Sequence, residues 1–202
     1  MKPRPRRLAP LLILAALASP VAGPLLATEE PASKQAPKKK ADPAADLARI
    51  KALLRDVGDA PRDEKVAILA RLDGLGGRSD AARDFLAEFA RDGGPEASRE
   101  ARFFAAAVVA GFGKPTRIGP NSLGPGTSLE WYIDLQRGTP ISGPRRLKLD
   151  PALKDLKVEV ARNAKDDLHF QEILWTILDR YRLDFKLDAD DTFVIVPMPP
   201  GT

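Results

Sequence analysis

The sequence predicts an α+β fold in which about four N-terminal helices, arranged as helical hairpins, precede a small α+β domain with one helix on a short sheet. The prediction rests on a change in hydrophobic period. Apolar residues recur at three- and four-residue steps over residues 44–112, whereas they alternate with polar residues over much of residues 128–198. One apolar stripe of helical period interrupts this alternation after residue 168.

The first 27 residues have the layout of a secretory signal peptide. Four basic residues and no acidic residue accompany an apolar run over residues 8–18. This run is too short to cross a bilayer, whose hydrocarbon core needs about 20 residues. We expect cleavage after Ala27 and an exported protein, periplasmic or extracellular, without a stable membrane span; an uncleaved anchor is the alternative.

The basic character of the chain belongs to this N-terminal segment. The 202 residues include 32 Lys and Arg against 28 Asp and Glu, which gives a net charge of +4. Without the four basic residues of the signal segment the two signs balance, so nucleic-acid binding loses its electrostatic support. The chain has no cysteine, which excludes disulfides and thiolate chemistry.

The N-terminal half predicts a linker and then a helical domain. Residues 28–43 mix Pro, Lys and Ala without apolar period and are expected to be a disordered linker. In the helical domain over residues 44–112, Pro61 suits the first position of the second helix, Ser79 can cap the third and Pro95 opens the fourth. Two helix pairs of similar length resemble HEAT-like helical repeats, and a four-helix bundle fits the same spacing.

The C-terminal half predicts short strands around one helix. Residues 113–127 are dense in Gly and Pro, so we expect an irregular linker and a domain boundary there. In the second domain, residues 129–135 alternate as in a half-buried strand. Further strands are expected over residues 147–149 and 156–160.

A helix and a strand pair complete this domain. Asp166 or Asp167 can cap the helix that carries the apolar stripe to residue 181. Strands over residues 183–187 and 193–196 follow, joined by a turn of Asp residues at 188–191. This order makes a small layer in which one helix covers one face of a short sheet.

Residues 147–197 are similar to the short N-terminal domain shared by secretins and TonB-dependent receptors. In that family a V-x-V strand is followed by a Leu-spaced helix, a strand with an aromatic residue, a turn and a closing strand. The matching positions are Val158, Val160, residues 168–178, Leu183, Phe185, Asp190, Asp191, Val194 and Ile195. The resemblance implies a periplasmic protein–protein interaction domain, linked to secretion or transport machinery.

Candidate partner-binding residues lie in this second domain. Trp175 falls off the apolar stripe of its helix, and large aromatic side chains concentrate at interfaces; the alternative is that the helical domain covers this side. His169, the single histidine, lies on the same helix surface. Arg145 and Arg146 belong to the densest basic group of the domain, for which a solvated face is the alternative.

A further candidate comes from adjacent aromatic residues in the expected strand at 129–135. Trp131 and Tyr132 would point to opposite faces, so one is core and the other exposed. Core packing of Trp131 is the default, which makes Tyr132 the candidate partner contact. An exposed aromatic ring could also stack on a sugar, which supports a cell-wall or polysaccharide binder as the alternative function.

Motifs for catalysis, cofactors and metals do not emerge. No spacing pairs His169 with a serine nucleophile, and the adjacent Asp166 and Asp167 point in different directions on a helix. Residues 111–116 lack the strand and uninterrupted Lys-Thr pair of a phosphate loop, and the turn at 188–191 lacks the glycine and distal glutamate of an EF-hand. We expect no enzymatic activity, no cofactor and no metal, and an envelope protein as the partner.

Overall fold

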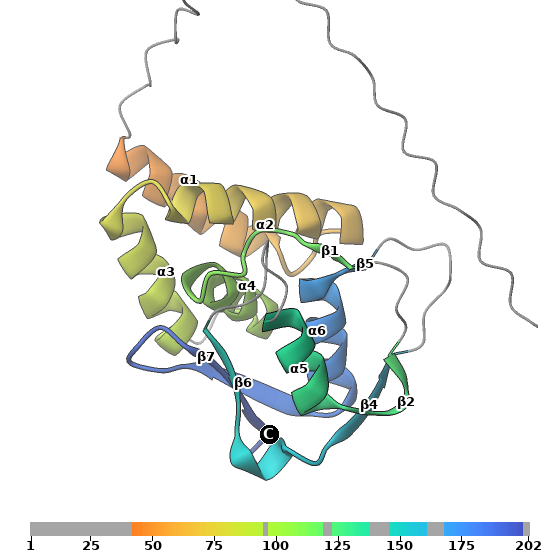
Figure 1. The fold of residues 1–202 in the computed structure, drawn as a ribbon. Coiled ribbons are helices and arrows are strands. Elements are labelled where there is room, and N and C mark those ends of the chain that lie inside the picture. The colour runs from red at the N-terminus through yellow and green to blue at the C-terminus, as the bar shows by residue number, and fades with distance from the viewer. Residues whose placement is uncertain (1–41, 95–96, 119–122, 138–145, 161–167, 200–202) are drawn as a thin grey trace, which may run out of the picture. The chain divides into compact units, whose positions relative to one another are not determined.

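Four helices form the N-terminal part of the protein, as the apolar spacing predicts (Figure 1). The computed structural model describes residues 42–94, 97–118, 123–137, 146–160 and 168–199; the expected signal segment and nearly all of the expected linker at 28–43 lie outside these residues. The helices are α1 (Pro43–Asp56), α2 (Arg62–Gly76), α3 (Asp80–Asp92) and α4 (Arg99–Val109).

Polar caps start three of these helices. The Asp42 carboxylate accepts hydrogen bonds from the first turn of α1, at 3.1 and 3.3 Å, and the hydroxyls of Ser79 and Ser98 do the same for α3 and α4. The cap at Ser79 is confirmed. Pro61 lies one position before α2, as its N-cap. The predicted start of the fourth helix at Pro95 falls outside the described residues.

The four helices meet in one core, because each of them contacts the other three. Gly76 at the end of α2 allows a close approach to two of these helices. A Cβ atom at this position would lie 2.9 Å from side-chain carbons of both Leu86 and Val108, on α3 and α4. Each helix therefore buries its apolar stripe against the others, and a larger residue at position 76 would require the Leu86 and Val108 side chains to move.

The C-terminal part contains the predicted strands and helix. They are β3 (Leu147–Leu149), β4 (Lys157–Val160), α6 (Phe170–Arg180), β6 (Leu183–Leu187) and β7 (Phe193–Pro197), with a 3-10 turn at Pro151–Leu153. In the three-stranded sheet β7 is central, parallel to β3 and antiparallel to β6. Helices followed by short strands confirm the α+β class.

Residues 129–135 were predicted as a strand, and this prediction is wrong: they belong to helix α5 (Leu129–Arg137). The Ser128 hydroxyl accepts the backbone N–H of Trp131 at 3.5 Å, as a helix cap does. Leu129, Tyr132 and Ile133 are buried at helical spacing, while Trp131 faces solvent. The alternating apolar residues therefore fall on two faces of a helix instead of one face of a strand.

The segment expected as an irregular linker, residues 113–127, contains two short strands. β1 (Arg117–Ile118) pairs with β5 (Leu168–His169), and β2 (Leu123–Ser128) pairs with β4, both antiparallel. Glycine and proline do not prevent pairing here, because each strand has only one partner and leaves its other edge unpaired within the described residues.

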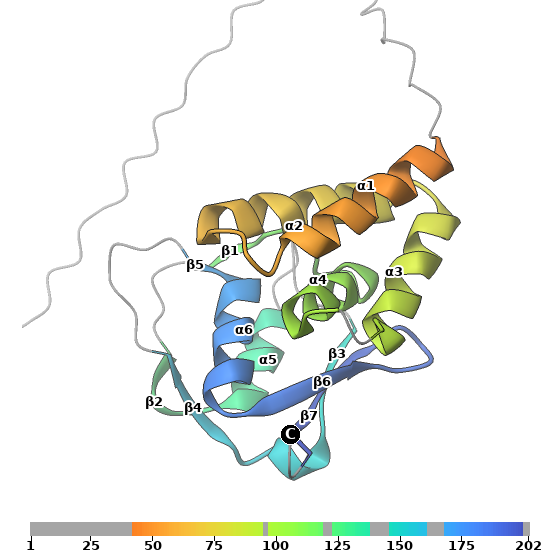
Figure 2. The ribbon, with the colours of Figure 1, turned by 180° about the vertical axis from the view of Figure 1, so that it is seen from behind.

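One core joins the helices to the sheet, and residues 39–202 form one compact unit. Phe103 of α4 is fully buried, and its ring centroid lies 5.3 Å from that of Trp175 and 5.7 Å from those of Phe185 and Phe193. In Figures 1 and 2, α1 and α2 lie on one side of α4 and α6, and the β6–β7 hairpin lies on the other. Among the described residues, no helix has the length and apolar character that spanning a membrane requires.

Candidate functional site

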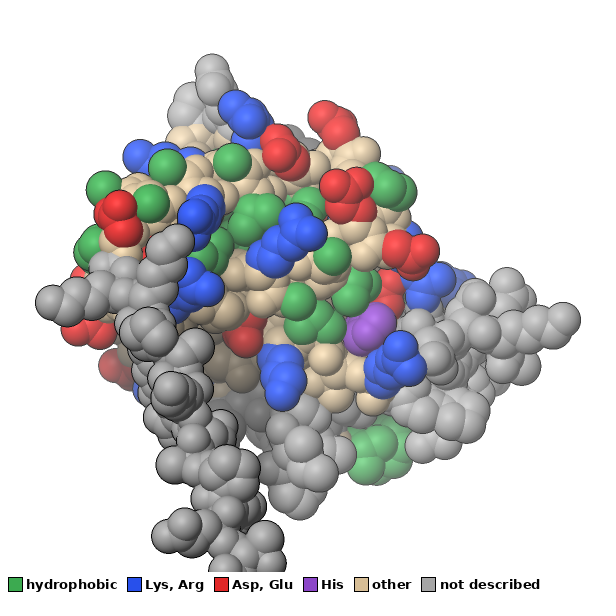
Figure 3. Space-filling model, turned by 90° about the horizontal axis from the view of Figure 1, so that it is seen from above, with side chains coloured by type: hydrophobic (Ala, Val, Ile, Leu, Met, Phe, Trp, Pro, Cys, Tyr) green, Lys and Arg blue, Asp and Glu red, His purple; other side chains and the backbone are tan. Residues whose placement is uncertain are grey.

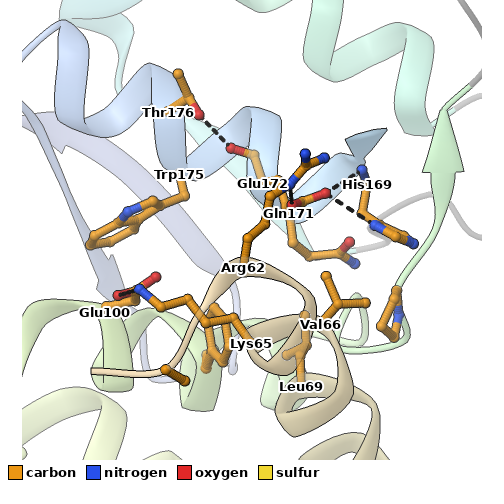
Figure 4. A pocket seen from close by; sticks show the side chains of 13 residues that line it. Arg62, Lys65, Val66, Leu69, Glu100, His169, Gln171, Glu172, Trp175 and Thr176 are labelled. Carbon is orange, nitrogen blue, oxygen red and sulfur yellow. Dashed lines mark hydrogen bonds and ion pairs between the residues drawn. The ribbon is translucent and has the colours of Figure 1, made fainter. Parts of the chain in front are cut away.

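A cavity of about 310 Å³ lies between α2, α4 and the first half of α6, and we call it the Trp175 pocket (Figure 4). Its apolar wall is formed by Val66, Leu69, Phe104 and Trp175. Its charged rim is formed by Arg62, Lys65, Glu100 and Glu172, with the His169 ring beside them. The volume is near the lower end of that of small-molecule sites, about 300–1,000 Å³. It suits a single side chain or another group of that size.

The helix period brings the α2 residues to the pocket. Arg62, Val66 and Leu69 follow one another at four- and three-residue steps, so they share one face of α2. Leu69 is buried and Val66 half-buried, while Arg62 at the helix start reaches the rim. Phe104 of α4 is buried behind them. In Figure 4 the Val66 and Leu69 side chains point from α2 toward α6.

An ion pair links α2 to α4 at one end of the rim. The Lys65 Nζ lies 2.7 Å from the Glu100 Oε2, with the two side chains 25% and 14% exposed. This low exposure limits screening by solvent, so the pair holds the two helices more firmly than a surface ion pair does.

Glu172 of α6 is the centre of a second group of charges. Its carboxylate accepts a hydrogen bond from Arg62 Nε at 2.5 Å and another from the backbone N–H of His169 at 2.8 Å, and it lies 3.0 Å from the His169 Nδ1. Burial by itself raises the pKa of Glu172, but the hydrogen bonds from Arg62 and His169 outweigh it and hold the pKa below its ordinary value. The carboxylate is therefore charged and fixed in place.

His169 is the N-cap of α6, and the predicted caps Asp166 and Asp167 lie outside the described residues. Its side chain is 17% exposed. Figure 3 shows the chain's single histidine, in purple, beside hydrophobic and basic side chains on this face of the protein. The structure thus brings two predicted contact residues, His169 and Trp175, to one pocket.

Trp175 is half-buried, in keeping with the alternative that the helical part covers this side of α6. Its ring packs against Phe103 on the protein side, and the Arg99 guanidinium lies 5.2 Å from the ring centroid. A cation at this distance is attracted to the face of an indole ring. The remaining surface of Trp175 lines the pocket, so its orientation is fixed before any ligand enters.

Gln171 holds the start of α6, and with it the pocket wall, in place through hydrogen bonds of its side chain. Its buried side chain donates to the carbonyls of Phe112 and Lys114, at 2.5 and 2.9 Å, and its Oε1 accepts from the Thr116 backbone N–H at 3.4 Å. These bonds tie the start of α6 to the segment after α4, which carries the lining residue Pro115. The pocket therefore has a rigid frame on this side.

The other predicted contact residues lie elsewhere. Arg146 is exposed at the start of β3, where it donates to the Asp190 carbonyl and lies 3.8 Å from the Asp191 carboxylate, and Arg145 falls outside the described residues. Tyr132 is buried, so the expectation that it is the exposed ring of the Trp131–Tyr132 pair is wrong. Because residues 129–137 form a helix, Trp131 is the exposed ring instead, at 55% exposure.

Two carboxylates of the acidic turn between β6 and β7 are bound by other groups of the protein. Asp188 accepts hydrogen bonds from the backbone N–H groups of Asp190 and Thr192, and Asp191 pairs with Arg83 and Arg91. Within the part of the chain that the structure describes, no three His, Asp or Glu side chains gather as metal ligands.

Sequence reasoning missed most of the charged rim. Glu172 could have been found, since a glutamate three residues after a helix N-cap is the signature of a capping box. Arg62, Lys65 and Glu100 carry no such local signal, because their partners are 110 and 35 positions away in the sequence.

A wider hollow between α1 and α2 is a weaker candidate site. It has a volume of about 550 Å³ and is lined by Arg49, Arg71 and Arg78 beside Leu53 and Leu75. All three arginines are exposed, and the lining contains no aromatic side chain. Arg49 and Arg78 both pair with the buried Asp46 carboxylate at 3.4 Å, so two of its cations are already engaged, and the hollow lacks the aromatic anchor of the Trp175 pocket.

No family model, no curated protein and no solved structure matches this chain. The resemblances to the short N-terminal domain of secretins and TonB-dependent receptors and to HEAT-like repeats therefore stay predictions.

Proposed function

We propose that the protein is an exported, non-catalytic protein–protein interaction module of the cell envelope that binds its partner at the Trp175 pocket. One observation carries the proposal: a half-buried tryptophan and an apolar wall lie inside a rim of charged side chains. Interfaces concentrate their binding energy in such aromatic anchors, which are surrounded by polar groups that exclude water.

The pairing of the charged side chains in the rim favours binding over catalysis. Glu172 and Glu100 are each held by a cation, and His169 lies against Glu172. A general base or nucleophile has to reach a substrate atom, whereas these groups are occupied with one another. Their role is to fix the shape of the pocket.

The cellular setting follows from the sequence. The N-terminal segment has the layout of an export signal, and residues 147–197 resemble the interaction domain of secretins and TonB-dependent receptors. Both features support a partner in the periplasm, linked to secretion or transport machinery. The resemblance covers α6, which contributes Trp175, His169 and Glu172 to the pocket.

Photo-crosslinking in intact cells tests this proposal. A photoreactive side chain replaces Thr176, an exposed residue that lines the pocket, and in a matched control it replaces Ala67, an exposed residue of α2 that does not. We expect one envelope protein to be crosslinked from position 176 and not from position 67. Equal crosslinking at both positions, or none at position 176, would contradict the proposal.

A second candidate function is binding to a cell-wall or other envelope polysaccharide. Trp131 and Leu135 are 55% and 44% exposed and lie four residues apart, so they form one apolar face on α5. An exposed tryptophan ring can stack on the face of a sugar. Retention on purified envelope polysaccharide that is lost in Trp131→Ala would support this function, and absence of retention would remove it.

A further inference from the structure

The rim of the Trp175 pocket carries no net formal charge. Arg62 and Lys65 are balanced by Glu172 and Glu100, and each cation lies within 2.7 Å of its carboxylate. His169 adds a ring nitrogen 3.0 Å from Glu172. The four charged side chains therefore add no net charge that would attract an anion or a cation to the pocket.

The pairing also disfavours a charged ligand inside the pocket. Such a ligand would lose its hydration and would have to break an ion pair to gain a partner. The carboxylates that it would have to free are only 14% and 20% exposed, and a buried charge left without its partner is costly. An uncharged group meets neither penalty.

The wall favours an aromatic group among uncharged ones. Two aromatic side chains, Phe104 and Trp175, line the cavity together with Val66 and Leu69. Aromatic rings gain about 0.5–1.5 kcal/mol from edge-to-face or offset contacts beyond the burial of their area. Trp175 already has such a neighbour on its inner side, where Phe103 lies tilted by 53°.

We propose that the Trp175 pocket takes up one uncharged aromatic side chain, of the size of phenylalanine or tyrosine, from a partner polypeptide. This inference rests on the proposed function and names the chemistry of the anchor residue. The volume of about 310 Å³ has room for one such side chain, while the charged rim remains outside it to face the partner's backbone.

A titration of the wild-type protein, observed by NMR, tests the inference. The probe is N-acetyl-phenylalaninamide, and the signal is the indole N–H resonance of Trp175. The exposed Trp131 is an internal control, because it lies outside the pocket lining. We expect a saturable shift of the Trp175 resonance and no comparable shift of the Trp131 resonance.

Charged probes provide the first comparison, on the wild-type protein alone. N-acetyl-argininamide and N-acetyl-glutamic acid amide should bind at least about tenfold more weakly than the neutral aromatic probe. Equal or tighter binding of either charged probe would overturn the inference. So would the absence of any shift of Trp175 with N-acetyl-phenylalaninamide.

A matched pair of variants provides the second comparison. Ala60→Phe puts an aromatic side chain into the pocket from its own lining, whereas Ala67→Phe adds the same side chain on the exposed face of α2. Ala60→Phe should weaken probe binding at least about tenfold, and Ala67→Phe should leave it unchanged. Unchanged binding in a folded Ala60→Phe would overturn the inference.

The two proposals fail separately. If the partner is crosslinked from position 176 but the neutral probe does not bind, the anchor chemistry is wrong and the interaction module stands. If the probe binds but no protein is crosslinked, the pocket has the expected chemistry and the proposed function is wrong.

Discussion

At the scale of single residues, Glu172 joins the two sides of the Trp175 pocket. It lies on α6, accepts a hydrogen bond from Arg62 at the start of α2, and caps its own helix through the His169 backbone. Those bonds favour the ionised carboxylate and keep the pKa of Glu172 below its ordinary value of 4.5. A lowered pKa in the folded state means that the charged form stabilises the protein.

Glu172→Gln should change the response of the protein to acid. In the unfolded chain the Glu172 carboxyl takes up its proton at a higher pH than in the folded protein, so its stabilisation is complete above pH 4.5 and is lost as pH falls through the lower, folded pKa. The variant should be less stable than wild type by about 1 kcal/mol at neutral pH, and this difference should shrink in acid. Urea denaturation at a series of pH values measures it.

The control for this series is Glu64→Gln, which removes an exposed carboxylate from the first turn of α2. Glu64 does not line the pocket. A constant difference between wild type and Glu172→Gln at every pH would show that the charge of Glu172 contributes nothing to stability.

Local sequence signals predict the residues of the pocket unevenly. Trp175 could be identified because it falls off an apolar stripe, and His169 because it was expected on the same helix surface. The Arg62–Glu172 pair depends on how α2 packs beside α6, and no pattern within either helix encodes that contact. Sequence reasoning therefore finds one side of the pocket and misses the opposite one.

At the scale of elements, Asp191 attaches the β6–β7 hairpin to α3. Its carboxylate lies 2.8 Å from Arg91 and 3.2 Å from Arg83, both on α3, and Arg91 also donates to the Asp188 carbonyl. Asp191 has a φ of 58°, a left-handed conformation that aspartate and asparagine tolerate better than most residues. The backbone of the turn thus aims this carboxylate at the helix.

Asp191→Asn should loosen this attachment without straining the turn. Asparagine keeps the left-handed backbone but loses the charge, so the free energy of unfolding should fall by about 1 kcal/mol, the loss expected for partly exposed ion pairs with Arg83, Arg91 and, at the longer distance of 3.8 Å, Arg146. Thermal denaturation at low and high salt measures the loss, which salt should reduce. Asp190→Asn is the control, because Asp190 takes part in the hydrogen bonds of this turn through its backbone N–H and carbonyl groups.

Helix α5 shows where periodicity alone misleads. Leu129, Trp131, Ile133 and Leu135 alternate with polar or aromatic residues, which is the period of a strand. The same nine-residue segment also has apolar or aromatic residues at 129, 132 and 133, which lie on one face of a helix. The hydrogen bond from the Trp131 backbone N–H to the Ser128 hydroxyl then favours the helix. The strands predicted at 147–149, 183–187 and 193–196 are found as β3, β6 and β7, because their apolar residues are bounded by turn residues.

At the scale of the whole molecule, Phe103 connects the helical part to the sheet. It lies on α4, and its ring contacts the aromatic rings of Trp175 on α6, Phe185 on β6 and Phe193 on β7. The sequence suggested two segments with different hydrophobic periods, but it could not show that they share one core, because such contacts depend on tertiary packing. The pocket lies where the two segments meet.

Phe103→Ala should destabilise both segments together. Removing a fully buried phenylalanine costs about 3–5 kcal/mol, since it leaves a cavity among the neighbouring rings. Circular dichroism of the helices and tryptophan fluorescence should show one coincident transition at a lower urea concentration. Two separate transitions would mean that the helical part folds alone. The control is Phe89→Ala, at a half-buried site on α3, which should lower the free energy of unfolding by less than Phe103→Ala does.

The most direct test of the account combines the in-cell crosslink with the pair of pocket variants. The photoreactive side chain stays at position 176, and Ala60→Phe or Ala67→Phe is added to the same protein. If the partner inserts an aromatic side chain into the Trp175 pocket, Ala60→Phe abolishes the crosslink and Ala67→Phe preserves it. A crosslink of undiminished yield in Ala60→Phe would contradict the claim that the partner is bound at this pocket.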